Sequence, residues 1–335
     1  MRKIVLGFVA LITSFLVYGD ETPFEKYPTF KVDGTLKSKV EYATSIESTR
    51  FSVNSSRVGV QGYFSKYFYY RGLIELSGNG KFAPLDLYAD FYPAEGLSIS
   101  FGQRTIPLFN NYTIVPTQLM FSNSPFLGGY MVGARDIGLL GQYQFGLFDI
   151  PTSVEFGVYN GGNINAPAWH KRPSYGGRIA LGTMQGWRAT VKYYDHDSSL
   201  EENIRYDLYG ADVRYESDKW KIETEMMKRR DRAQGEGDIL SYYVQGAYIH
   251  QLDKDKMIKN FIPALRFDGI DQNGNSGFDV NRITLGLGFG LSEKYLSSIF
   301  RIDYEHYFVN NTPHFMSTDK TVTSNKVTVE LVLVF

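Results

Sequence analysis

The chain has 335 residues, no Cys, and a formal net charge of −1 at pH 7, with 35 Lys and Arg against 36 Asp and Glu. The balanced charge argues against nucleic acid as a partner, and the lack of Cys excludes disulfides and a lipid-acceptor thiol. Abundant Tyr (25), Phe (24) and Gly (33) beside 12 Pro favour an all-β architecture.

The first residues have the pattern of a secretory signal peptide. Arg2 and Lys3 precede an apolar stretch over residues 4–17, and the stretch ends just before Gly19. It is shorter than a membrane-spanning helix requires. We therefore predict a signal peptide at 1–19, cleaved on export, and a single β domain at 20–335.

Alternating apolar and polar residues recur through the rest of the chain. In "NRITLGLGFGL" (281–291), for example, every second residue from Ile283 to Leu291 is apolar. A period of two predicts a β-strand with one apolar face. About sixteen such strands are predicted, beginning near residues 30, 50, 66, 84, 96, 132, 152, 175, 186, 203, 219, 238, 260, 280, 296 and 325.

The number of strands favours a closed barrel in a membrane. A soluble two-sheet sandwich needs only about seven to nine strands, and a barrel in lipid satisfies every backbone hydrogen bond without leaving an edge. Tyr and Phe clusters such as "KYFYYRG" (66–72) and "SYYVQGAY" (241–248) lie near strand ends. They fit an aromatic girdle at the water interfaces, although aromatics also favour strands in general. We predict a transmembrane antiparallel β-barrel in the outer-membrane lipid of a Gram-negative bacterium.

The chain ends on the alternating stretch "KVTVELVLVF" (326–335), in which Val327, Val329, Leu331, Leu333 and Phe335 share one face. Taken alone, this strand would also suit the core of a sandwich. In a barrel, its apolar face contacts lipid. The final Phe335 resembles the C-terminal assembly signal of outer-membrane barrels, which implies the barrel-assembly machinery as a partner.

Several segments, in order along the chain, resemble the family of phosphate-selective porins O and P. They include "FSVNSSRVGVQGYF" (51–64), "APLDLYADFYPAEGLSISFGQRTIPLFNN" (83–111), "ARDIGLLGQY" (134–143), "LYGADVRYESDKWKIETEM" (208–226) and "RITLGLGFG" (282–290). The resemblance implies a sixteen-stranded barrel, usually a homotrimer, with an inward-folded third loop that narrows the pore.

Residues 107–133 form the longest stretch without clear alternation, and long loops in compact folds are often functional. Their many apolar residues favour a loop folded into the lumen over an extracellular surface loop. Candidate constriction residues are Asn111, Tyr112, Gln118 and Asn123. Residues 105–134 contain no charged residue, whereas selecting a desolvated phosphate requires clustered basic groups. Phosphate specificity is therefore doubtful.

Strand parity places side chains of both charges inside the barrel. The candidate pore-lining residues are Arg57, Arg71, Arg104, Arg135, Asp86 and Asp90. Arg104 and Arg135, with Arg71, could form an electropositive wall, or the arginines could pair with Asp86, Asp90 and Asp136 in a rigid network. Walls of mixed charge predict a weakly selective pore.

The predicted function is passive diffusion of small hydrophilic solutes, with a mild anion preference. The alternatives are a plugged structural or adhesive barrel, and a hydrolase assembled from distant strands. No catalytic, cofactor or metal residue is predicted: "DQNGNSGFD" (271–279) is similar to a calcium loop, but Arg282 replaces the expected acidic residue. The basic run "KRRDR" (228–232) is either a contact for anionic lipid sugars or a solvated loop.

Overall fold

The computed structural model describes residues 26–335 except 54, 77–79, 109–118, 132, 163, 168, 198–203, 234, 236, 254, 274–276, 294–296 and 317–323. The predicted signal peptide, residues 1–19, lies outside the described residues and stays a prediction. Among the described residues, no helix is both long and apolar enough to cross a membrane.

Strands make up most of the described chain. They are β1 (Lys31–Ala43), β2 (Ser48–Ser52), β3 (Arg57–Ser65), β4 (Phe68–Leu76), β5 (Phe82–Ala94), β6 (Leu97–Thr105), β7 (Arg135–Leu147), β8 (Ile150–Tyr159), β9 (Ser174–Gly182), β10 (Gly186–Asp197), β11 (Arg205–Glu216), β12 (Trp220–Asp231), β13 (Ile239–Tyr248), β14 (His250–Gln251), β15 (Asn260–Gln272), β16 (Val280–Gly290), β17 (Ile299–Val309) and β18 (Lys326–Val334). Because β2 and β3 both pair with β1, and β13 and β14 both pair with β15, these segments form sixteen strands within the described residues. The predicted strand number is confirmed.

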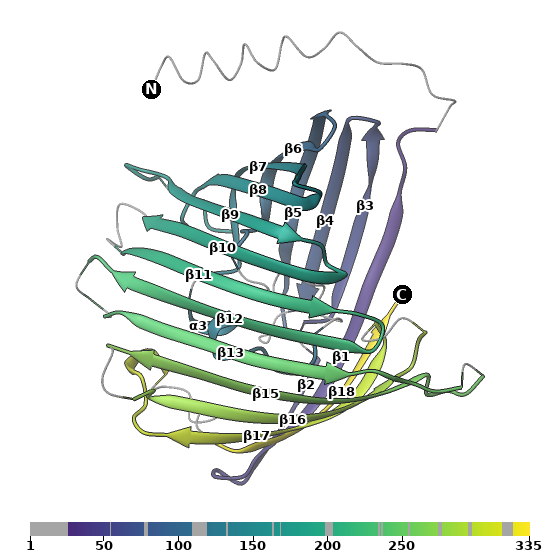
Figure 1. The fold of residues 1–335 in the computed structure, drawn as a ribbon, viewed down its shortest axis with the longest axis vertical. Helices are drawn as coiled ribbons and strands as arrows, with labels where there is room; N and C mark the ends of the chain where they lie inside the picture. The colour runs from purple at the N-terminus through teal and green to yellow at the C-terminus, as the bar shows by residue number, and fades with distance from the viewer. Residues whose placement is uncertain are drawn as a thin grey trace.

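The strands form one antiparallel sheet that closes on itself (Figure 1). Strands that follow one another in the chain are neighbours, and β18 pairs with β1 in the register from Thr35 opposite Val334 to Ala43 opposite Lys326. The pairing continues past the strand ends, since the Gly34 amide donates to the Phe335 carbonyl at 2.9 Å and the Phe335 amide donates to the Gly34 carbonyl at 3.1 Å. Closure joins β1 to β18, so the sheet formed by the described residues has no edge strand.

A bulge between β2 and β3 reverses which residues face inward. The register with β1 changes from Lys39 opposite Ser52 to Thr35 opposite Arg57, so residues 53–56 contain one more residue than the opposing stretch of β1. Even-numbered Arg50 on β2 reaches the inward Glu41, whereas odd-numbered Arg57 faces inward on β3. An extra residue shifts a period-two pattern by one, so the alternation of this strand is not continuous.

The two ends of the barrel differ in their connections. Turns such as 66–67, 95–96 and 148–149 join strands at one end, where the C-terminus also lies (Figure 1). Longer connections join them at the other end, and the longest, residues 106–134 between β6 and β7, contains the short helix α3 (Phe126–Tyr130). This length difference gives the barrel a short-turn end and a long-loop end.

Apolar side chains cover much of the outside. On β18, Val327 and Leu333 are exposed, as is Phe335 just after the strand, and Lys326, Thr328 and Glu330 are buried. Aromatic pairs also lie on this outer surface, with ring centroids of Trp187 and Tyr215 4.9 Å apart. The apolar face of the C-terminal strand therefore points outward, as its alternation predicts.

Candidate functional site in the barrel interior

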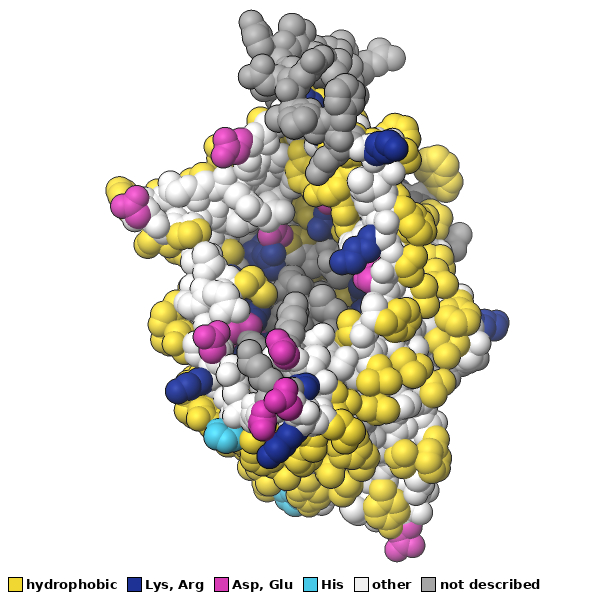
Figure 2. Space-filling model, turned by 90° about the vertical axis from the view of Figure 1, so that its right-hand side faces the viewer, with side chains coloured by type: hydrophobic (Ala, Val, Ile, Leu, Met, Phe, Trp, Pro, Cys, Tyr) yellow, Lys and Arg dark blue, Asp and Glu magenta, His cyan; other side chains and the backbone are white. Residues whose placement is uncertain are grey.

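Polar and charged side chains line the inside of the barrel. On β12, Lys221, Glu223 and Glu225 are at most 2% exposed, while the alternate residues Ile222 and Met226 are 43% and 56% exposed. Figure 2 looks at the side where the C-terminus lies, and shows a hollow bordered by Lys or Arg and by Asp or Glu, with hydrophobic side chains spread over the surface around it. The arrangement is the inverse of that in a soluble protein, because the polar groups are inside and the apolar groups are outside.

Each of the four arginines predicted to line a pore forms an ion pair with a carboxylate on another strand. Their side chains are between 11% and 24% exposed, so the charges are partly withdrawn from solvent. The pairs are Arg57–Glu75 at 2.5 Å, Arg71–Asp33 at 2.6 Å, Arg104–Asp90 at 3.0 Å and Arg135–Asp86 at 2.7 Å. Each of these positive groups on the wall therefore has a negative neighbour.

Of the two arrangements left open by the sequence, the paired network matches these contacts better than an unbalanced electropositive wall. Asp86 and Asp90 pair as that alternative expected, but the carboxylate of Asp136 accepts hydrogen bonds from the amides of Ile137 and Gly161, both at 2.7 Å. Arg71 pairs with Asp33, a partner that was not predicted. Whether these side chains line a conducting pore stays a prediction.

The backbone of residues 119–126 is held by three arginines and two carboxylates from β15, β16 and β17. Carbonyl oxygens of the segment accept from the arginines, and two amides donate to the carboxylates. The bonds are Arg301 to Leu119 at 2.5 Å, Arg266 to Asn123 at 2.8 Å, Arg282 to Ser124 at 2.9 Å, Ser122 to Asp303 at 2.7 Å and Phe126 to Asp268 at 2.9 Å. Because hydrogen bonds to charged groups are the stronger kind, this segment is firmly attached to inward side chains of the wall.

Asn123 lies at the centre of these contacts. Its side-chain oxygen accepts from Lys39 at 2.8 Å, and its amide nitrogen lies 3.4 Å from Glu41 and 3.3 Å from Glu305. The other predicted constriction residues, Asn111, Tyr112 and Gln118, lie outside the described residues. The inward folding of the whole loop therefore stays a prediction, although residues 119–126 contact interior side chains.

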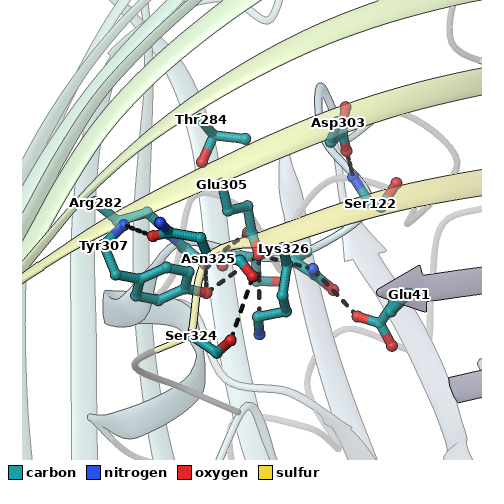
Figure 3. A network of polar contacts seen from close by, with 12 residues as sticks. Glu41, Ser122, Arg282, Thr284, Asp303, Glu305, Tyr307, Ser324, Asn325 and Lys326 are labelled. Carbon is teal, nitrogen blue, oxygen red and sulfur yellow. Dashed lines mark hydrogen bonds and ion pairs between the residues drawn. The ribbon is translucent and has the colours of Figure 1, made fainter. Parts of the chain in front are cut away.

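The attached segment joins a larger network across β16–β18 and β1 (Figure 3), to which Asp268 on β15 also belongs. Arg282 donates to Asp268 at 2.6 Å and to Glu305 at 2.8 Å, and the Tyr307 hydroxyl donates to Glu305 at 3.1 Å. These four side chains are buried. A buried guanidinium shared by two carboxylates has most of its donors satisfied, which is what makes such burial tolerable.

An apolar cluster occupies part of the interior. Ile106, Leu108 and Leu127 from the long connection are at most 1% exposed, and pack with inward residues such as Leu208 on β11 and Met227 on β12. These three apolar residues of the long connection are thus buried against inward side chains.

A cavity of about 1090 Å³ lies near the short turns on β7–β10. Its lining includes Gln142, Glu155, Arg178, Met184 and Arg188, and Arg178 donates to Glu155 at 2.6 Å. The cavity wall is therefore mixed in charge, like the rest of the interior. No group of three or more His, Asp or Glu suited to a metal occurs among the residues that the structure describes.

Several interior charges on the first strand were not among the predicted pore-lining residues. Lys37 pairs with Glu330 at 3.0 Å, and Lys39 pairs with Glu41 at 3.0 Å. The alternation in "KVDGTLKSKVEYA" places all three β1 residues on one face, so this signal was available. The cross-strand partner Glu330 follows only from closure of the barrel.

No family model matches the chain, and no curated protein matches it. Solved structures are similar in fold. An anion-selective porin from Comamonas acidovorans is 13% identical, with a TM-score of 0.64 over 92% of this chain and 99% of that one. OmpF of Salmonella typhi, in complex with daunomycin, is 12% identical, with a TM-score of 0.64 over 91% and 97%. The in-vitro folded trimer form of OmpT, an outer membrane protein of Vibrio cholerae, is 9% identical, with a TM-score of 0.61 over 92% and 99%. The chain therefore has the fold seen in these outer-membrane proteins.

Proposed function

We propose that the protein is an outer-membrane porin that conducts small hydrophilic solutes by passive diffusion. The observation that carries the proposal is a closed barrel with charged residues inside, such as Lys221 and Glu223, and apolar residues outside, such as Ile222 and Met226. Such a barrel is stable in lipid and encloses a polar path. The porins and outer-membrane proteins of similar fold support the same assignment, and we propose no catalytic role.

The channel is expected to be weakly selective. The four arginines on β3, β4, β6 and β7 are each balanced by a carboxylate within 3.0 Å, so little net field remains to sort ions. A mild anion preference is the finer proposal, supported by the anion-selective porin of similar fold. We do not propose phosphate selection, because residues 105–134 contribute no charge. The resemblance to phosphate-selective porins O and P stays a prediction.

Residues 106–134 are proposed to narrow the channel. This proposal is supported by the hydrogen bonds that Arg266, Arg282 and Arg301 donate to backbone carbonyls of residues 119–124. A loop tied to one wall leaves the opposite wall, on β3–β7, to border the path.

A homotrimer in the outer membrane is proposed, supported by the trimer form of OmpT. Export by a signal peptide at 1–19, and assembly by the barrel-assembly machinery acting on Phe335, belong to the same proposal.

Planar-bilayer recording of the purified full chain tests the central proposal. Stepwise increases in current at fixed voltage are expected as single proteins insert. Insertion without any ion conductance, with insertion checked by protease protection in vesicles, would reject the channel and support a plugged barrel.

A further inference from the structure

The basic run at 228–232 is not simply a solvated loop, because four of its five residues belong to strand β12. Alternation there divides the run between the two faces of the sheet. Lys228 and Arg230 are exposed and share the parity of the outward Ile222 and Met226. Arg229 points inward, where its guanidinium lies 4.9 Å from the Tyr206 ring centroid and donates to the Met131 carbonyl.

Neighbouring strands extend this outward face. Tyr209 on β11 is opposite Lys228, and Asp207 is opposite Arg230. On β10, Tyr193 is opposite Tyr209, and their ring centroids are 5.3 Å apart. The three strands lie side by side in Figure 1. Moving toward the long-loop end, the outer surface thus passes from paired tyrosines to a row of charges.

Two carboxylates in this region are covered, whereas the arginines that pair with them are accessible. Asp195 and Asp207 lie opposite each other and are 8% and 7% exposed. Arg232 pairs with both, at 3.1 Å from Asp207, and Arg172 also pairs with Asp195. The arginine side chains remain 32% and 40% exposed. These two acids hold the guanidinium groups of Arg172 and Arg232 in place, and the guanidinium groups are the more exposed members of these pairs.

Two further basic side chains belong to the same surface. Arg205 is 43% exposed and pairs with Asp197 at 3.4 Å, while Lys228 is 56% exposed and pairs with Asp238 at 3.4 Å. Arg230 is exposed and forms no ion pair with a described residue. We name Arg172, Arg205, Lys228, Arg230 and Arg232 the outer basic patch.

We infer that the outer basic patch binds the phosphate groups of an anionic lipid in the surrounding membrane leaflet. Below the patch, toward the middle of the strands, the outward residues Met226, Val213 and Val191 are 56%, 42% and 57% exposed and suit acyl chains. Tyrosines at the boundary fit the interface between chains and headgroups. Guanidinium groups at headgroup depth match phosphate in charge and geometry. A lipid is favoured over free phosphate because the outer basic patch adjoins the apolar outer surface. A lipid can contact both surfaces, whereas free phosphate contacts only the basic one.

The inference rests on the proposed location in the outer membrane, but not on conductance. Lys228 and Arg230 face away from the interior, so ion conductance is expected to be unchanged when they are replaced. A loss of lipid binding with normal conductance, or the reverse, separates the two proposals.

The test is a titration of the full chain in detergent with bisphosphorylated lipid A. Native mass spectrometry measures how much lipid is bound. The double variant Lys228→Gln with Arg230→Gln leaves the Asp195 and Asp207 ion pairs intact. Each lost charge should weaken binding about fivefold, or roughly 25-fold together. Lys256→Gln, at an exposed short turn on the opposite end, is the matched control and should bind as the unmodified chain does.

Dephosphorylated lipid A supplies the second arm. Weaker binding of this lipid to the unmodified chain, together with a loss in the double variant and none in the Lys256 variant, is the expected result. Equal binding of both lipids would overturn the inference, as would a double variant that binds bisphosphorylated lipid A as tightly as the unmodified chain.

Discussion

The ring of Phe335 lies against the backbone of Gly34, where the last strand meets the first. A Cβ atom added at Gly34 would come 2.2 Å from Cζ of Phe335. Two backbone hydrogen bonds join the same residues, at 2.9 and 3.1 Å. The glycine therefore makes room for the terminal aromatic at the seam that closes the barrel.

Gly34→Ala should destabilise this seam. The methyl group overlaps the Phe335 ring, which must swing away, and overpacking of this kind costs about 1–3 kcal/mol. Equilibrium urea unfolding in lipid vesicles measures the change. Gly146→Ala is the control because nothing lies within 4 Å of a Cβ added there. Equal stability of the two variants would show that the close packing of Phe335 on Gly34 does not stabilise the barrel.

Replacing one member of the Arg104–Asp90 pair should shift ion selectivity. Arg104→Ala leaves the Asp90 carboxylate unbalanced and should favour cations, whereas Asp90→Asn should favour anions. One charge about 4 Å from a permeating ion in water is worth about 1 kcal/mol, or roughly a fivefold change in permeability ratio at most. Reversal potentials in a potassium chloride gradient report the ratio. Shifts of the same sign in both variants would refute the assignment of this pair to the conducting path.

Arg282→Leu should destabilise the interior network. Asp268 and Glu305 would each lose a donor, at 2.6 and 2.8 Å, and the Ser124 carbonyl would lose one at 2.9 Å. Breaking a buried ion pair by removing one partner costs about 3–5 kcal/mol. Urea unfolding of Arg282→Leu, of Asp268→Asn, of the double variant that carries both changes, and of Lys256→Gln as the control measures this cost. The double variant should lose less than the two single changes added together, and strict additivity would argue against the coupling.

Asn123→Cys tests whether residues 106–134 border the conducting path. The chain has no Cys, so a small charged thiol reagent would label only this position. Labelling should lower single-channel current, because Asn123 contacts the interior Lys39 and Glu305. A matched Lys256→Cys variant should be labelled without a change in current. An unchanged current in fully labelled Asn123→Cys protein, confirmed by mass, would place the path elsewhere.

Much of the fold could be predicted from local patterns. The alternation in residues 326–335 predicted an outward Val327 and Phe335 and an inward Glu330, and the structure has all three. Predicted strand starts near residues 186, 260 and 280 coincide with β10, β15 and β16. These features follow from a period of two, which depends only on neighbouring residues in the chain.

The ion pairs inside the barrel could not be predicted from such local patterns. Arg71 pairs with Asp33 and Lys37 with Glu330, and both depend on which strands become neighbours and in which register. The bulge at residues 53–56 also reversed the inward parity between β2 and β3 without a clear signal.

The sequence by itself determined the strand number and which side chains share a strand face, because these are properties of short stretches of chain. The export signal is also a property of a short stretch, and it stays an expectation. Only the tertiary structure decided which charges balance each other and that Arg266, Arg282 and Arg301 hold residues 119–124. The physical reason is that closure of the sheet sets the stagger between strands, and the stagger determines which inward side chains come within hydrogen-bonding distance.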